Sequence, residues 1–200
     1  MLKRAISLAR LWNLKRSVLC VHSGISIVDM NWGSVKRPER KEVFVLTTKR
    51  ALELLERSDE RRFQRVQREI KYIVNEVVAS SGGEYGFDIK RCSIDFDRYN
   101  VQLHSGHYEW HVAQYASFIV HEATHGHLFS RGIPYSKKTR GRVERLCCIE
   151  QRRFAQKLHS DTYNFSADLV PDCDEVSATS EGSPFFTFAR YVHQCIRNFR

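Results

Sequence analysis

The feature that most constrains this chain is the segment FIVHEATHGHLFSRG, residues 118–132, which places three histidines and a glutamate within seven positions. Apolar residues precede the segment and Pro134 follows it, so the sequence predicts one helix from about residue 109 to residue 129. Four apolar positions fall together on the side of this helix away from His121: Val112, Ala116, Ile119 and Ala123. The helix therefore has an apolar back suited to a core and a front that carries polar residues.

Helical geometry divides the polar residues of this segment into two groups. Successive residues of an α-helix turn by about 100°, so His121 and His125 lie roughly 40° apart on one face, separated by one turn. Two imidazoles at this spacing can hold one metal ion, and Glu122 lies beside the same face, where it could act as a general base. His127 lies roughly 240° from His121 and cannot join the pair. The alternative is an ordinary amphipathic helix that happens to be rich in histidine.

A catalytic zinc ion keeps three protein ligands and one open position, so a third ligand is needed downstream. A second helix, predicted over residues 140–158, contains two candidates, Glu144 and Glu150. Its apolar side is centred near Glu144, its arginines lie on the other side, and Glu150 lies at the margin. A lone carboxylate on a buried face is costly unless it is paired or bound to metal, which favours Glu144 as the ligand. Glu150 remains an outer partner or alternative ligand, and a buried ion pair is the alternative role for Glu144.

The order His121-Glu122-x-x-His125, then eighteen residues, then Glu144 resembles the HExxH–Glu zinc metallopeptidases, the gluzincins. The segment VHEATHGHL, followed by the segment RVERLCCIE, is also similar to segments of small uncharacterised bacterial zinc-peptidase-like proteins. The resemblance covers about 35 residues, from residue 116 to about residue 151. It implies a zincin-like fold, Zn²⁺ bound by the two histidines and Glu144, Glu122 as the catalytic base, and a peptide or protein substrate.

Peptide hydrolysis at such a centre also needs a donor toward the substrate carbonyl oxygen and a surface that aligns the substrate. The candidates for the donor are Tyr135, His127, Tyr99 and His104. A strand among residues 92–104 is expected to lie along the cleft and to pair with an extended substrate. Partners behind the imidazoles should orient them, and the candidates are Asp95, Asp97 and Asp161. The alternative, which the sequence favours for each of them, is an ordinary surface carboxylate.

The rest of the chain predicts an α+β fold. Alternating apolar and polar residues predict strands over residues 17–28, with a break at Gly24, and over residues 42–48, 87–99 and 101–104. Loops are expected over residues 35–41, 80–86, 131–139 and 168–184, a helix broken near Ser58-Asp59 over residues 49–79, and a closing basic aromatic helix over residues 184–200. We therefore expect a single zincin-like domain, residues 1–200, in which a small mixed sheet packs on the HExxH helix and the following ligand helix. The metal-site helices occupy residues 109–158.

The formal net charge of +9 favours weak contact with nucleic acid or with an anionic membrane surface, although the basic residues are spread along the chain. Residues 1–16 contain five basic and no acidic residues, which predicts a basic amphipathic helix that docks on the domain or lies on a membrane surface. No apolar run approaches the ~18–20 residues that span a bilayer. None of the six cysteines forms a CxxC pair, which disfavours a zinc ribbon and favours free thiols in a reducing compartment. These features predict a cytoplasmic protein, with peripheral membrane association as an alternative.

Three functions fit these residues. The first is a zinc-dependent metallopeptidase. The second is a basic, nucleic-acid-associated HExxH protein similar to the DNA-linked proteases of the Spartan-like kind, which the charge of +9 favours and the missing CxxC ribbon disfavours. The third is a non-catalytic module in which zinc is structural.

Overall fold

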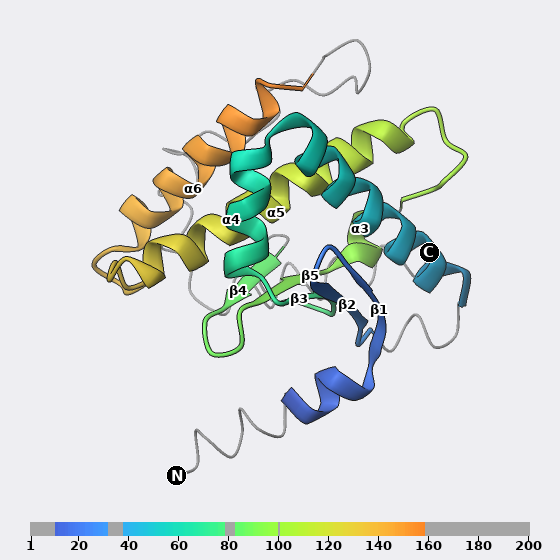
Figure 1. Ribbon diagram of the computed structural model, residues 1–200, viewed down its shortest axis with the longest axis horizontal. Helices are drawn as coiled ribbons and strands as arrows, with labels where there is room; N and C mark the ends of the chain where they lie inside the picture. Colours follow the sequence, from blue (N-terminus) through green and yellow to red (C-terminus); the bar gives the residue numbers. More distant parts are fainter. Residues whose placement is uncertain (1–10, 32–37, 79–82, 100, 159–200) are drawn as a thin grey trace, which may run out of the picture.

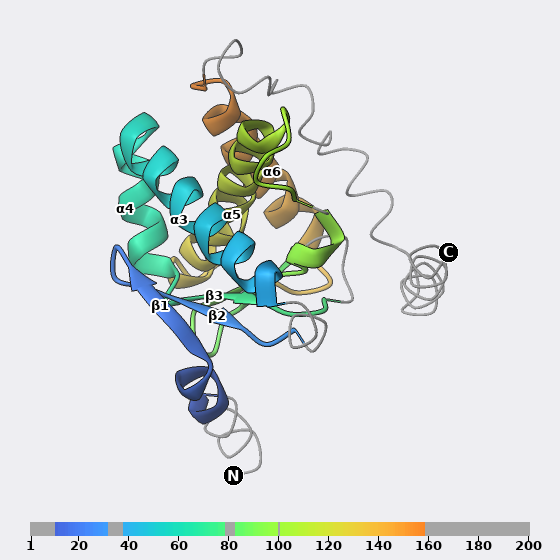
Figure 2. The same cartoon turned by 90° about the vertical axis from the view of Figure 1, so that its right-hand side faces the viewer.

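The computed structural model describes residues 11–31, 38–78, 83–99 and 101–158 of the chain (Figure 1). These residues fold as α+β, with a small mixed sheet and helices, which confirms the predicted class at that level. In Figure 2 the helices over residues 38–58, 60–69, 108–130 and 140–155 lie on one face of the sheet, and the helical residues 11–16 lie on the other face. The rest of the predicted N-terminal helix, the loop over residues 168–184 and the closing helix lie outside the described residues.

Five short strands form the sheet in the order β1-β2-β3-β5-β4. Their bounds are Val18–His22 for β1, Ile25–Asp29 for β2, Tyr72–Asn75 for β3, Gly83–Gly86 for β4 and Arg91–Ile94 for β5. β2, β3 and β5 run parallel, whereas β1 and β4 are antiparallel to their neighbours. The predicted break within residues 17–28 is a two-residue hairpin turn, in which Ser23 and Gly24 have φ of 50° and 78°.

Alternation along the central strands divides the apolar residues between two faces. Ile27 and Ile73 belong to the main core beneath the helices, whereas Val28 and Val74 pack with Leu14 on the opposite face. Because successive side chains of a strand point to opposite faces, these parallel strands are buried on both sides. The helical turn over residues 11–16 therefore covers the second face of the sheet.

The predicted strand over residues 42–48 is wrong, because this segment lies inside the helix α3 (Pro38–Ser58). Its β-branched and aromatic residues suggested a strand, but the side chains that become buried recur at helical spacing: Phe44, Thr47, Thr48, Ala51, Leu52 and Leu55. The hydroxyl of Thr48 donates to the Phe44 carbonyl at 2.7 Å, which satisfies it within the buried face. Pro38 is the first residue of the helix, where a missing N–H costs nothing. The predicted loop over residues 35–41 is therefore helical from residue 38 onward.

The predicted break near residue 59 is confirmed, since α3 ends at Ser58 and α4 (Glu60–Glu69) begins after Asp59. The Asp59 carboxylate accepts a hydrogen bond from the Arg62 amide at 3.3 Å and pairs with the side chains of Arg62 and Lys157. The expectation that the helix continues to residue 79 is wrong, because residues 72–75 form β3. A short apolar run such as YIVN has no period that separates a buried strand from a helix.

The region around residues 80–104 also differs from the prediction. Residues 83–86 form β4 instead of a loop, residues 96–99 form a 3₁₀ turn, η1 (Phe96–Tyr99), and residues 101–104 form no strand. Only residues 91–94 of the predicted strand pair are extended, as β5. β5 is paired on both sides, by β3 and by β4, so β4 is the last described strand at this end of the sheet.

Helix α5 (Tyr108–Ser130) contains the HEATH segment and lies between α3, α4, α6 and β4. The apolar back predicted from the sequence is buried at all four positions: Val112, Ala116, Ile119 and Ala123. Helix α6 (Arg140–Ala155) follows the predicted connector over residues 131–139 and packs along α5. The two helices predicted to carry the metal ligands are therefore neighbours in the fold.

Two glycines allow α5 to lie close to the sheet and to α4, because neither glycine carries a Cβ atom. A Cβ atom at Gly83 of β4 would lie 2.2 Å from the Phe118 ring of α5, and one at Gly126 of α5 would lie 2.5 Å from the Tyr85 hydroxyl. That hydroxyl donates to the Glu69 carbonyl at 2.6 Å, which ties the end of α4 to β4. β4 is thus held directly against the HEATH segment.

Among the described residues, no helix is long and apolar enough to cross a membrane. Cys20, Cys92, Cys147 and Cys148 are free thiols, as predicted. Cys173 and Cys195 lie outside the described residues.

Candidate metal centre

The packing of α5 against α6 brings together three side chains that the sequence predicts as metal ligands. The Nε2 atoms of His121 and His125 lie 3.2 Å apart. Glu144 Oε2 lies 3.4 Å from His121 Nε2 and 3.7 Å from His125 Nε2. The two nitrogens and the oxygen therefore form a nearly equilateral triangle, with two corners from one helix and one corner from the next.

The size of this triangle suits a tetrahedral zinc ion. Zinc bonds to nitrogen and oxygen of about 2.0–2.2 Å place neighbouring ligand atoms roughly 3.3–3.6 Å apart. The three observed separations lie within or close to that range, so one ion can reach all three atoms with small side-chain adjustments. Two imidazole nitrogens and one carboxylate oxygen are also a donor set that catalytic zinc uses. The residues present thus fit the ion.

Gln151 of α6 orients the first histidine. Its Oε1 lies 3.1 Å from His121 Nδ1, and its Nε2 donates to Ser117 Oγ at 3.2 Å. Because an amide oxygen only accepts, His121 Nδ1–H is the donor, which leaves Nε2 to face the triangle. The sequence suggested aspartates for this role. Of these, Asp97 accepts from the Asn31 side chain instead, and Asp161 lies outside the described residues.

Tyr135, in the connector between α5 and α6, holds the carboxylate. Its hydroxyl donates to Glu144 Oε1 at 2.5 Å, which leaves Oε2 directed at the histidines. The Tyr135 ring stands nearly perpendicular to the ring of His125, with centroids 5.3 Å apart. Because the tyrosine is 37% exposed, it marks the side of the cluster that solvent or a substrate could reach.

Glu122 lies next to His121 on α5 and is only 3% exposed. Burial raises the pKa of Glu122 to about 7; the nearby His121 opposes the shift, and the charges of Glu144 and Glu84 add to it. A carboxyl group with this pKa can both accept and return a proton near neutral pH.

The candidate ligands His125 and Glu144 are in the protonation states that a metal requires. Burial, assisted by the neighbouring His121, lowers the pKa of His125 to about 4, so its imidazole is neutral at pH 7. Burial would raise the pKa of Glu144, but the hydrogen bond with His121, the charge of His125 and the Tyr135 hydroxyl outweigh it and hold the pKa at about 2. The carboxylate is therefore ionised at neutral pH.

His121 behaves differently in the metal-free chain. Burial acts to lower its pKa, but hydrogen bonds to Cys148 and Glu144 outweigh burial and raise the pKa to about 10. The metal-free cluster therefore holds a proton on His121, and an entering cation must displace it.

The other predicted site residues differ in whether they contact the histidine–glutamate cluster. Glu150 Oε2 lies 2.8 Å from Arg65 and 3.2 Å from Arg62, and Glu150 Oε1 lies 3.0 Å from Arg153, so this carboxylate joins α4 to α6 within an arginine cluster. His127 lies 3.8 Å from Glu69 on the α4 side, as its helical angle predicted. Of the other proposed donors, Tyr135 contacts the cluster and His104 is exposed before α5, whereas the Tyr99 side chain lies outside the described part of the structure.

Sequence reasoning missed two members of the cluster, Gln151 and Cys147. A nitrogen of each histidine and the Cys147 sulfur all lie within 4.8 Å of one another. Both missed residues share the face of α6 that carries Glu144, at i+7 and i+3, which is the signal that could have found them. Burial holds the pKa of Cys147 well above its usual value, so in the metal-free chain the group is a neutral thiol.

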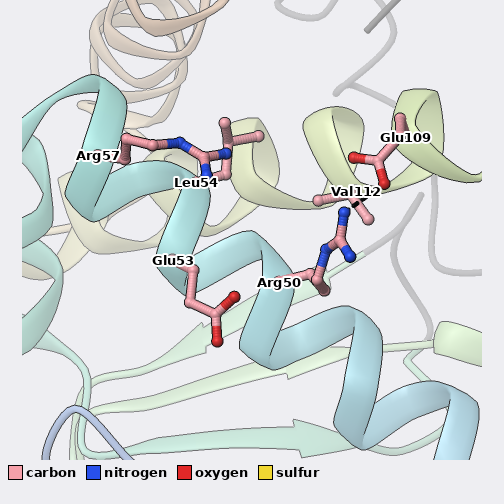
Figure 3. A pocket seen from close by; sticks show the side chains of 6 residues that line it. All are labelled: Arg50, Glu53, Leu54, Arg57, Glu109 and Val112. Atoms are coloured by element: carbon pink, nitrogen blue, oxygen red, sulfur yellow. Dashed lines mark hydrogen bonds and ion pairs between the residues drawn. The ribbon is translucent and has the colours of Figure 1, made fainter. Parts of the chain in front are cut away.

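A hollow between α3 and α5 has a different character (Figure 3). Its lining is mostly charged and consists of Arg50, Glu53, Leu54, Arg57, Glu109 and Val112. Arg50 and Glu109 form an ion pair across it. It shares no residue with the metal cluster, and it offers neither histidine nor cysteine as a ligand.

Comparisons with known proteins leave the function to be argued from the chain itself. A scan against protein-family models found no match, and neither did searches of the curated proteins and of the solved structures. The geometry of the histidine–glutamate cluster is therefore the ground on which a function can be proposed.

Proposed function

We propose that the chain is a zinc-dependent metallopeptidase in which His121, His125 and Glu144 bind Zn²⁺ and Glu122 is the general base. The observation that carries this proposal is the triangle of donor atoms, with sides of 3.2, 3.4 and 3.7 Å, built from two packed helices. Such convergence of two imidazoles, one buried and one partly buried, with a carboxylate is costly without a cation, because it concentrates largely desolvated polar groups at one point.

Bound zinc would supply a Lewis acid for the substrate carbonyl and would lower the pKa of water toward about 7. Glu122 would accept a proton from the attacking water and return it to the leaving amine, which its pKa of about 7 permits in both directions. Gln151 would keep His121 in the tautomer that binds through Nε2. Tyr135, half-exposed beside the cluster, is the candidate to donate to the substrate carbonyl oxygen.

The edge strand β4 supports a peptide substrate. It is antiparallel to β5, is the last described strand at its end of the sheet, and packs against α5 through Gly83 and Phe118. An extended peptide could add to this edge by backbone hydrogen bonds and would then pass beside the HEATH segment. β4 takes the role that the sequence suggested for residues 92–104. We interpret this arrangement of sheet, HEATH helix and ligand helix as zincin-like.

The proposal is tested by peptide hydrolysis with zinc-loaded protein, comparing the wild type with Glu122→Gln. The amide keeps the shape of the carboxyl group but cannot accept the proton, so the rate should fall by roughly 10²–10⁴-fold while zinc content is unchanged. Glu56→Gln, at an exposed position of α3 away from the cluster, serves as the matched control and should retain most of the activity. A fully zinc-loaded wild type that cleaves no member of a broad peptide library would refute the proposal.

A further inference from the structure

Cys147 lies where a fourth ligand of the cluster would be expected. It follows Glu144 by one turn of α6, and its side chain is completely buried. Its sulfur and one nitrogen of each histidine lie within 4.8 Å of one another. Zinc bonds of about 2.0–2.1 Å to nitrogen and about 2.3 Å to sulfur separate such atoms by roughly 3.5–3.6 Å. The remaining gap is on the order of 1 Å, which small side-chain rotations can close.

The chemistry of the group favours bonding over simple packing. Thiolate sulfur is a preferred ligand of zinc, and mixed sets of cysteine, histidine and carboxylate are within its repertoire. As the sulfur–metal bond forms, the S–H bond breaks and the proton leaves to solvent, so the step requires no oxidant or reductant. The close group of donors consists of Cys147 and the two histidines; it includes neither Cys148, which is buried as well and hydrogen-bonds with His121, nor Glu144, so the carboxylate and the sulfur must both shift to share one ion.

We propose that Cys147 is a fourth protein ligand, so that His121, His125, Glu144 and Cys147 close around the ion when no substrate is bound. This inference rests on the proposed metal site, and it adds a way in which the hydrolytic activity of that site is regulated. The thiolate fills the position that a hydrolytic centre must keep open. The resting centre is therefore latent, and hydrolysis requires Cys147 to leave the ion.

Cobalt substitution reports the sulfur ligand without any need for activity. Co²⁺ is titrated into the metal-free full chain, and two signals are followed: the visible d–d bands of a tetrahedral site and the near-ultraviolet thiolate-to-cobalt charge-transfer band. The wild type should show both. Cys147→Ser should lose the charge-transfer band and keep the d–d bands, whereas the matched control Cys148→Ser should keep both. His125→Ala should weaken both, which locates the ion at this cluster.

The outcomes separate this inference from the proposed function. Tetrahedral d–d bands without a charge-transfer band in the wild type would overturn the role of Cys147 and leave a three-ligand centre intact. Loss of the charge-transfer band in Cys148→Ser alone would assign the sulfur to Cys148 and also overturn it. No cobalt binding at all would refute the metal site and both proposals with it. Should Cys147→Ser fail to fold, zinc X-ray absorption of the wild type decides: a sulfur shell at about 2.3 Å supports the inference, and nitrogen and oxygen shells alone overturn it.

Discussion

Substitution Gly126→Ala tests whether the packing around the HEATH segment is as close as described. In a helix, alanine is ordinarily more stable than glycine by about 1 kcal/mol, so helix propensity alone predicts stabilisation. The structure predicts the opposite, because a Cβ atom at this position would lie 2.5 Å from Tyr85 Oη, 2.6 Å from Tyr85 Cζ and 3.0 Å from Glu69 Cβ. The Tyr85 ring would have to move, and its hydroxyl would lose the 2.6 Å bond to the Glu69 carbonyl.

The magnitude follows from these contacts. Overpacking costs about 1–3 kcal/mol, and a buried hydrogen bond left unmade costs about 1–3 kcal/mol. After subtracting the propensity gain of about 1 kcal/mol, we expect a net loss of roughly 1–5 kcal/mol. Urea unfolding of chelator-treated protein measures the free energy of unfolding without a contribution from metal binding. Gly106→Ala is the control, because a Cβ atom there meets nothing within 4 Å. Unchanged or increased stability of Gly126→Ala would refute the reasoning.

Three further predictions concern zinc binding, the orientation of His121 and the stability of the start of α4. Zinc affinity should rise between pH 6 and pH 8, because the raised pKa of His121 keeps a proton on the metal-free cluster and zinc must displace that proton. Metal-competition titration at several pH values measures the affinity. An affinity that does not change with pH would contradict the prediction. Gln151→Leu should weaken zinc binding by roughly 10–100-fold, whereas Gln156→Leu at the exposed C-cap of α6 should not; equal affinities of the two variants for zinc would exclude an orienting role for Gln151. Asp59→Ala should lower the free energy of unfolding by about 2–4 kcal/mol, because α4 loses its cap and Arg62 and Lys157 lose their ion-pair partner. The control Glu60→Ala should lower it by at most ~0.5 kcal/mol. Equal effects of the two substitutions in thermal unfolding would contradict the role of Asp59.

The helices that carry the ligands could be predicted because their signal is long and local. α5 repeats its buried apolar residues at helical spacing from Tyr108 to Ala123, over roughly four turns, so the helix and the shared face of His121 and His125 follow from periodicity. The same reasoning separated Glu144 from Glu150. In the structure Glu144 faces the histidines, whereas Glu150 lies among arginines.

The strands were harder to predict because their identity depends on distant partners. The segment YIVN becomes β3 only by lying between β2 and β5, and GEYG becomes β4 only by pairing with β5. Four residues offer too few repeats for a period to decide, and the edge strand contains two glycines. The segment over residues 42–48 misled for a related reason, since its β-branched residues are equally compatible with one buried face of α3.

The supporting residues of the site could not be read from the sequence because they depend on how α5 and α6 pack. Gln151 and Cys147 lie on the face of α6 that periodicity marks as buried, where a cysteine is most often a small apolar residue. Only the contact with α5 places the amide oxygen at His121 Nδ1 and the sulfur near both imidazoles. Tyr135 lies in a connector, whose path periodicity does not predict.

The most direct test of the account is the zinc content of the purified protein, measured together with Glu144→Ala and its matched control Glu150→Ala on the same helix. The account predicts close to one zinc per chain in the wild type and in Glu150→Ala, because Glu150 bonds to arginines and not to the cluster. Zinc should be largely lost in Glu144→Ala. A wild type that binds no zinc even after reconstitution, or zinc that depends on Glu150 and not on Glu144, would contradict it.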